Sequence, residues 1–140
     1  MTEPAAPFNA AGPFAGLGGE DIDGILAVGA AETFPGGAAI FEAGDRGEAM
    51  YVITAGEARV EAGGRFHVLK AGDFFGEMAL LAPGPRMATV KAETDVETLR
   101  IPAEAFQDFL LAHPAVGVSM MKQLVIRLRE VEQRIDAWMA

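Results

Sequence analysis

Short apolar segments separated by glycine-bearing turns fill the middle of this chain, from Glu32 to about Pro102. In pieces such as EARVE and RFHVLK polar and apolar residues interleave, and glycine recurs at intervals of roughly 8 to 12 residues. About seven or eight such pieces, with no long helical pattern between them, favour a β-sandwich or barrel over alternating strand–helix units. The sequence therefore predicts an all-β body.

Helical patterns flank this β region on both sides. The segment Gly19–Ala30, GEDIDGILAVGA, has apolar residues at helical spacing and acids in its first turn, which predicts a short N-terminal helix. After Pro102, the segment PAEAFQDFLLAH predicts a second helix that stops before Pro114, and residues 115–138 predict a third. One apolar stripe, suited to core packing or to a seam with another helix, runs through Met121, Leu124, Leu128, Val131, Ile135 and Trp138.

The length of 140 residues suits one domain with one hydrophobic core. Residues 1–15 are rich in Ala, Pro and Gly and predict a flexible lead-in, so that residues 16–140 would form the domain itself. The chain has no cysteine, which excludes a disulfide scaffold and thiolate chemistry. We find no internal repeat and no second domain.

The charge balance limits the class of partner. A net charge of −9 argues against a nucleic-acid-binding surface, because such a surface needs a clustered basic face. No apolar run approaches the roughly 18 residues of a membrane span, and the N-terminus lacks the basic start and apolar middle of a signal peptide. We therefore expect a cytoplasmic protein with no membrane insertion and no nucleic-acid partner.

The sequence lacks the familiar catalytic and metal-binding patterns. Metal enzymes of β-barrel type need two or three histidines and a carboxylate around one ion, whereas this chain has two histidines, His67 and His113. We expect both to be surface or turn residues. The one serine, Ser119, falls inside the last predicted helix without a strand–turn–helix elbow. The sequence therefore predicts a protein that is not an enzyme, with no catalytic residues and no bound metal.

The stretch Phe75–Val90, FGEMALLAPGPRMATV, holds two opposite charges, Glu77 and Arg86, among apolar and small residues. Gly76 permits unusual backbone angles and the close approach of a ligand. The short helical piece EMALL would expose backbone N–H groups at its start, which suit an anion. The planar fork of donors on Arg86 fits a phosphate, and Glu77, which can only accept hydrogen bonds, suits sugar hydroxyls.

Two interpretations of these charges stay open at this point. In one, Arg86 binds a phosphate and Glu77 binds a ribose, so that the pocket takes a nucleotide with a single negative charge. In the other, Glu77 and Arg86 form a salt bridge that closes a turn without any ligand. A buried guanidinium without a fixed anion is costly, because it loses several kcal/mol of hydration.

The same stretch resembles the phosphate-binding cassette of cyclic nucleotide-binding domains, whose pattern is F-G-E-x-[AS]-L, a short spacer and [PR]-R-x-A-[ST]-[VA]. The spacing from Glu77 to Arg86 fits this pattern without a gap. Upstream, AGDRGEAMYVITAGEARV is similar to the acidic turn, aromatic strand and following glycine of the family. With the two trailing helices included, the resemblance covers approximately Phe14 to Arg134.

This resemblance implies a mainly β fold with flanking helices: a jelly-roll β-sandwich of about eight strands, one N-terminal helix and two C-terminal helices. Residues 16–140 would then be the cyclic nucleotide-binding domain. By matching position, Arg86 would clamp the cyclic phosphate and Glu77 would accept the ribose 2′-hydroxyl. Further contacts around the ribose and phosphate would come from Gly76, Met78, Ala79 and Ala88.

Met87 and Arg127 bear on the base of the nucleotide. In this family a Thr or Ser directly after the cassette arginine can bond to guanine, whereas Met87 has no hydroxyl and offers a polarisable apolar surface. The resemblance therefore favours cAMP over cGMP as the ligand. Arg127 matches by position a lid arginine of some bacterial channel-type members, where the guanidinium stacks on the purine. A solvated helix arginine is the other interpretation of Arg127.

The predicted function is a cyclic nucleotide sensor or regulatory module that transmits ligand occupancy through its C-terminal helices. Its partners would be the nucleotide, an unknown protein effector and, through the last helix, a second copy of the chain. Two alternatives stay open. One is a regulatory domain separated from a cyclic nucleotide-gated channel or a transcription factor. The other is a degenerate roll that has lost nucleotide binding and acts as an interaction protein.

Overall fold

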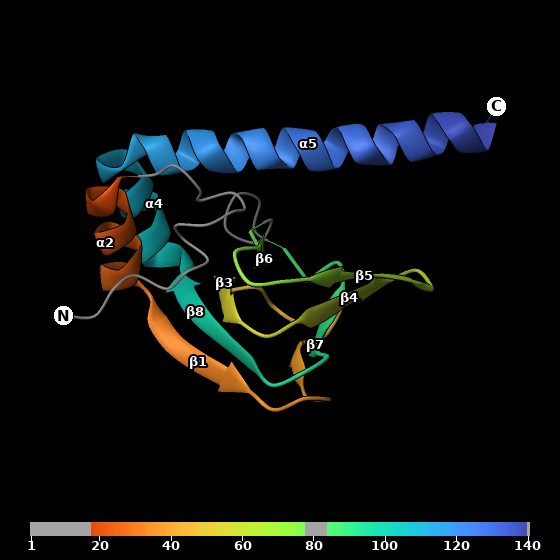
Figure 1. The fold of residues 1–140 in the computed structure, drawn as a ribbon, viewed down its shortest axis with the longest axis horizontal. Helices are drawn as coiled ribbons and strands as arrows, with labels where there is room; N and C mark the ends of the chain where they lie inside the picture. Colours follow the sequence, from red (N-terminus) through yellow and green to blue (C-terminus); the bar gives the residue numbers. More distant parts are fainter. Residues whose placement is uncertain (1–17, 78–83, 140) are drawn as a thin grey trace.

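The computed structural model describes residues 18–77 and 84–139, and within them two four-stranded antiparallel sheets are flanked by helices at both ends of the chain (Figure 1). The predicted lead-in, residues 1–15, lies outside the described residues. The described elements are α2 (Gly19–Val28), β1 (Ala30–Phe34), β2 (Ala39–Phe41), β3 (Ala49–Ala55), β4 (Ala58–Ala62), β5 (Arg65–Leu69), β6 (Phe74–Phe75), β7 (Thr89–Ala92), β8 (Val96–Pro102), α4 (Ala103–Ala112) and α5 (Pro114–Met139). The predicted sandwich of eight strands, with one helix before it and two after it, is confirmed.

The strand order is β1-β8-β3-β6 in the first sheet and β2-β7-β4-β5 in the second. Strands β4 and β5 form a hairpin in which Ala62 pairs with Arg65. The two residues between them, Gly63 and Gly64, both have positive φ, which is the backbone of a tight type I′ turn. This turn fixes the register of β5 and therefore which of its side chains face the interior.

Two hydrophobic cores lie on opposite faces of the first sheet, and β3 serves both. Met50 and Val52 pack against the helices, whereas Tyr51 and Ile53 pack between the two sheets. Because side chains alternate along a strand, a strand covered on both faces reads as a continuous apolar run. This is why MYVI lacks the polar–apolar alternation seen in β4 and β5.

The N-terminal helix is shorter than predicted, and a strand follows it at once. α2 ends at Val28, whereas Ala30 already belongs to β1. Most of β1 is exposed, so it has no apolar run that could have revealed it in the sequence. At the junction, a Cβ on Gly29 would lie 2.5 Å from Leu99 Cγ, so a larger residue there would force the Leu99 side chain to shift.

The core-facing side of α5 differs from the apolar stripe predicted for it. Val116 and Met120 are buried in the helix core and Leu124 packs against it, but Met121 and Leu128 are 59% and 57% exposed. The core-packing interpretation of the stripe is therefore wrong for Met121 and Leu128. The other three stripe residues have side chains outside the described set: Val131, Ile135 and Trp138.

Helix α5 packs beside α2 and α4 at one end and projects past the strands at the other (Figure 1). Among the described residues, no single helix has the length and apolar character to cross a membrane. The pair α4 and α5 up to Glu130 meets these criteria only when the two are taken together across a bend of 110°.

Candidate functional site

A cleft of about 550 Å³ opens between the inner face of the sheet β2-β7-β4-β5, the end of β6 and helix α5. This volume is usual for a small-molecule site. The described lining is mostly apolar and includes four side chains with polar or charged ends: His67, Glu77, Arg86 and Arg127. Six of the eight residues predicted to bind ligand line this one cleft: Gly76, Glu77, Arg86, Met87, Ala88 and Arg127. The other two, Met78 and Ala79, lie outside the described residues, as does the short helix predicted there.

The floor of the cleft is one row of side chains that crosses the second sheet. Phe41 pairs with Val90, Val90 with Val60, and Val60 with His67, on four adjacent strands. Residues paired in this way point to the same face of a sheet, and all four line the cleft. The floor is therefore aromatic at one end, aliphatic in the middle and polar at the other end.

Arg86 is buried, and both its backbone and its side chain are held by other backbone groups. Its N–H donates to the carbonyl of Asp45 at 2.7 Å, and its own carbonyl accepts from the N–H of Gly44 at 2.8 Å. In the side chain, Nη1 donates to the Gly76 carbonyl at 3.0 Å and Nη2 to the Ala49 carbonyl at 2.6 Å. The guanidinium therefore has a fixed position and orientation.

The positive charge of Arg86 lacks a carboxylate partner within the described part of the chain. Its Cζ lies 4.0 Å from the centroid of the Phe41 ring, and its buried Nε has no hydrogen-bond partner among the residues that the structure describes. Burial lowers the pKa of Arg86, and the nearby Tyr51 and Glu77 offset this only in part. A buried cation with an unused donor is the arrangement expected of a site that binds an anion.

Gly76 makes this approach of Arg86 to the end of β6 possible. Its φ is +82°, in the region that favours glycine. A Cβ at this position would lie 2.9 Å from Arg86 Nη1 and 3.2 Å from the Ala49 carbonyl oxygen. Any side chain here would therefore strain the backbone and push against the guanidinium.

Glu77 is also buried, at 7% exposure, and its partner is a residue of α5. Its Oε1 lies 3.4 Å from Arg127 Nη1. Burial raises the pKa of Glu77, which its own backbone N–H, Arg127 and Arg86 counteract to a smaller extent. No ion pair joins Glu77 to Arg86 in the described structure, so the salt-bridge interpretation of these two charges is wrong.

The side chain of Arg127 connects α5 to the end of β6. Besides its contact with Glu77, its Nη2 donates to the Phe74 carbonyl at 3.1 Å, and its Cζ lies 4.4 Å from the Phe74 ring centroid. The side chain is about one-third exposed, so the interpretation of Arg127 as a freely solvated helix residue is wrong. No sequence pattern pointed to the pair of Glu77 and Arg127, because it joins residues 50 positions apart.

The remaining residues singled out from the sequence occupy the edges of the site or other places. Met87 is 72% exposed at the mouth of the cleft, and Ala88 is half-buried beside it. His67 is exposed on β5 and lines the cleft, a position that the alternation of RFHVL could have indicated.

His113 lies at the turn between α4 and α5, where its Nδ1 is 2.9 Å from Asp21 Oδ1. The described residues contain no cluster of three His, Cys, Asp or Glu that could hold a metal.

Comparison with known proteins agrees with this geometry. Residues 31–113 match the family model of the cyclic nucleotide-binding domain. The chain belongs to this family. The family is defined by nucleotide binding and is a regulatory domain rather than a class of enzyme.

Individual relatives cover different parts of the chain. It is 33% identical over 129 residues to the cyclic AMP receptor protein of Thermus thermophilus, which covers 88% of this chain and 60% of the relative. It is 46% identical over 63 residues to a cGMP-dependent protein kinase of Toxoplasma gondii, covering 44% of this chain and 6% of the kinase. The crystal structure of the Thermus thermophilus catabolite activator protein matches with a TM-score of 0.79 and 33% identity, over 89% of this chain and 61% of that one. The chain thus spans at most about 60% of the length of these relatives.

Proposed function

We propose that this chain is a sensor module that binds a cyclic nucleotide in the cleft, with cAMP favoured over cGMP. The observation that carries the proposal is Arg86, a buried guanidinium with an unpaired Nε and no carboxylate within reach in the described structure. A cyclic phosphodiester would supply the single negative charge that this position lacks, through strong charge-assisted hydrogen bonds.

The other cassette residues would divide the rest of the ligand between them. The carboxylate of Glu77 would accept the ribose 2′-hydroxyl, because a carboxylate accepts hydrogen bonds and cannot donate them. Gly76 has no side chain that would displace the Arg86 guanidinium, so it would keep that group in position to meet the phosphate. Met78, Ala79 and Ala88, which the sequence motif predicts to bind ligand, would make further contacts with the phosphate and the ribose.

The preference for cAMP depends on Met87, which lines the cleft and has no hydroxyl to offer to guanine. The Thermus thermophilus relative, which covers most of this chain, is named for cyclic AMP. The shorter match is to a kinase named for cGMP, so the choice of nucleotide needs a direct measurement.

Titration calorimetry with cAMP and cGMP tests the proposal, with 5′-AMP as a control that has the same base and sugar but a non-cyclic phosphate. We expect cAMP to bind more tightly than cGMP, and 5′-AMP to bind weakly. Tighter binding of cGMP would overturn the nucleotide preference alone. Absence of binding by both cyclic nucleotides would overturn the proposed function and favour a roll that acts as an interaction protein.

We further propose that Arg127 transmits ligand occupancy to α5. A ribose at Glu77 would compete with Arg127 for the same carboxylate, and a released Arg127 would be free to stack on the base. A ligand shifts a conformational equilibrium only through contacts that differ between two states, and this pair offers such a difference. Hydrogen exchange tests this route: saturating cAMP should change exchange along α5 in the wild type and much less in Arg127→Ala. An equal change in both proteins would exclude Arg127 as the connection.

The exposed face of α5 suits a second copy of the chain as partner. Four exposed apolar residues follow one another at steps of three and four, the spacing of a coiled-coil seam: Val118, Met121, Val125 and Leu128. Sedimentation of the wild type, in the same buffer as the binding measurements, should show a dimer. The Leu128→Glu variant should sediment as a monomer. A wild type that sediments as a monomer would leave this face to the unknown protein effector.

We propose that the module acts in the cytoplasm.

A further inference from the structure

The row of side chains on the cleft floor fixes positions along the length of the cleft. Phe41, Val90, Val60 and His67 lie on four adjacent strands, so the ends of the row are about 14 Å apart at ~4.8 Å per strand spacing. The guanidinium of Arg86 lies over Phe41, at one end of the row. His67 is at the other end, on the edge strand β5.

A guanidinium, a cyclic phosphate, a ribose and a purine placed in sequence have about this combined length. With the phosphate at Arg86, the ribose and the inner part of the base would lie over Val90 and Val60, which have no polar atoms to offer. The outer edge of a purine would reach His67. A pyrimidine base has one ring fewer, so it would be too short to reach His67.

We propose that His67 accepts a hydrogen bond from the 6-amino group at the outer edge of adenine and thereby strengthens the preference for cAMP that Met87 supports. This inference rests on the proposed function, since it takes the phosphate position from Arg86. A neutral imidazole has one nitrogen that donates and one that accepts, so it can accept from the 6-amino group of adenine. Its neighbours on the inner face, Val60 and Leu69, cannot form a hydrogen bond there.

The test combines two ligands with two variants. The ligands are cAMP and the cyclic monophosphate of purine riboside, which differs from cAMP only by lacking the 6-amino group. We expect the wild type to bind cAMP about 5- to 10-fold more tightly than this analogue, the size of one hydrogen bond. His67→Leu keeps a similar volume but has no polar atom, so we expect it to bind the two ligands equally.

Val68→Ala is the matched control, because Val68 is the next residue on β5 and its side chain points to the opposite face of the sheet. It should keep the wild-type preference for cAMP over the analogue, and His67→Gln should keep part of it. We also expect cCMP to bind His67→Leu and the wild type with the same affinity.

The outcomes separate this inference from the proposed function. If the wild type binds neither of these two ligands and no cGMP, the proposed function itself fails. If His67→Leu binds cAMP but keeps the full wild-type preference over the analogue, the role of His67 is overturned while the nucleotide site stands. Loss of the preference in His67→Leu, with its retention in Val68→Ala, supports the inference.

Discussion

Two arginines of this protein stack on phenylalanine rings on opposite sides of the same sheet, and their surroundings differ. On the outer face, Arg59 Cζ lies 3.6 Å from the Phe66 ring centroid. On the inner side, Arg86 Cζ lies 4.0 Å from the Phe41 ring centroid. The side chain and the stacking are the same, so the comparison isolates what else surrounds each charge.

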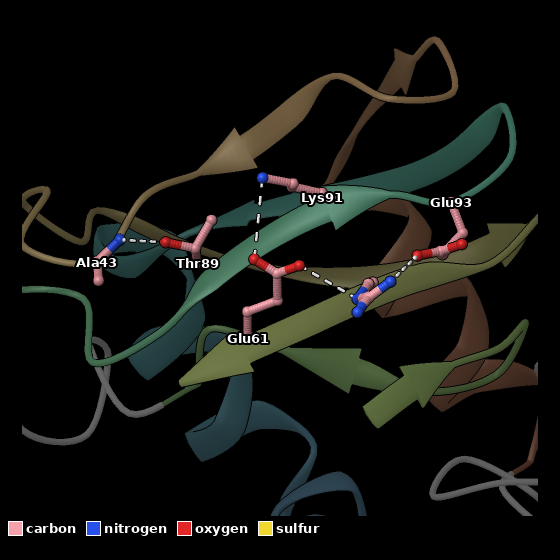
Figure 2. A network of polar contacts seen from close by, with 6 residues as sticks. Ala43, Glu61, Thr89, Lys91 and Glu93 are labelled. Atoms are coloured by element: carbon pink, nitrogen blue, oxygen red, sulfur yellow. Dashed lines mark hydrogen bonds and ion pairs between the residues drawn. The ribbon is translucent and has the colours of Figure 1, made fainter. Parts of the chain in front are cut away.

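On the outer face the charge of Arg59 is matched by carboxylates of the protein itself. Its Nε lies 3.1 Å from Glu61 Oε1, although the N–H is not aligned for a hydrogen bond, and its Nη1 lies 3.4 Å from Glu93 Oε1. Lys91 Nζ is 3.8 Å from the other oxygen of Glu61. Figure 2 labels three members of this network, Glu61 on β4, Lys91 on β7 and Glu93 just after β7, together with Thr89, whose hydroxyl accepts from the Ala43 N–H.

Among the described residues, Arg86 has only carbonyl oxygens as hydrogen-bond partners, and it is much less exposed than Arg59. Carbonyls orient a guanidinium without neutralising it, so Arg86 keeps an uncompensated charge in a place where water solvates it poorly. A stacked arginine is therefore not by itself a sign of an anion site. The sign is a stacked arginine that is buried, oriented and without a counter-ion.

The largest expected effect is that of Arg86→Ala on nucleotide binding. Removing one partner of a buried charge pair costs about 2–4 kcal/mol, which corresponds to a roughly 30- to 1,000-fold loss of cAMP affinity. Arg86→Lys keeps the charge but loses the fork, so its affinity should be intermediate. Calorimetry measures both, with circular dichroism to verify folding. Wild-type affinity in Arg86→Ala would remove the distinction between the two arginines.

Gly76→Ala should be next in size, because it disturbs the support of Arg86. We expect a loss of about 2–3 kcal/mol in the free energy of unfolding from left-handed backbone strain and crowding together, and weaker cAMP binding. Gly37→Ala is the control, since Gly37 has a similar φ of +90° but open space around it. Urea unfolding of the two variants separates strain from crowding. Equal losses would show that the contact with Arg86 is not tight.

Glu77→Gln should bind cAMP about 10-fold more weakly but be more stable without ligand at neutral pH. Because burial raises the pKa of Glu77 above its unfolded value, ionisation destabilises the folded state. This penalty is absent below the unfolded pKa, grows as the pH rises toward the folded pKa and is complete above it. Thermal unfolding from pH 3.5 to 8 should therefore show a stability gain for Glu77→Gln that appears only as the pH rises. A gain that does not vary with pH would contradict this assignment.

The smallest effect should be that of Arg59→Ala. Its ion pairs are about one-third exposed, so we expect a change below about 1 kcal/mol in the free energy of unfolding, reduced further at high salt. Calorimetry should give wild-type cAMP affinity for this variant. A marked loss of affinity would mean that the outer face contributes to binding and would break the contrast with Arg86.

The parts of the site that the sequence predicted are those encoded by neighbouring residues. Gly76, Glu77 and Arg86 belong to one short motif, and the structure brings them to one cleft. The pair of Glu77 and Arg127 was not predictable in this way, because it depends on where α5 lies relative to β6.

The fold shows the same contrast between features that neighbouring residues encode and features that depend on distant parts of the chain. Strand β3 was visible in the sequence because it is buried on both faces, whereas the exposed β1 left no apolar pattern. On α5 the periodicity correctly predicted a helix but not which side meets the core, because several of its faces carry apolar residues. Which face is buried is decided by α2, which is distant in the chain, and by α4, which packs back against α5 across the turn at His113.

Strand β6 is only two residues long, yet its two side chains enter different cores. Phe74 belongs to the core beneath the helices and Phe75 to the core between the sheets, and Gly76 follows directly. Two residues are the shortest segment of strand that can face both ways. A displacement of the backbone at Gly76 would thus move one aromatic ring in each core at the same time. The Gly76 end of β6 is therefore a position where a single small movement would change the packing of both halves of the protein.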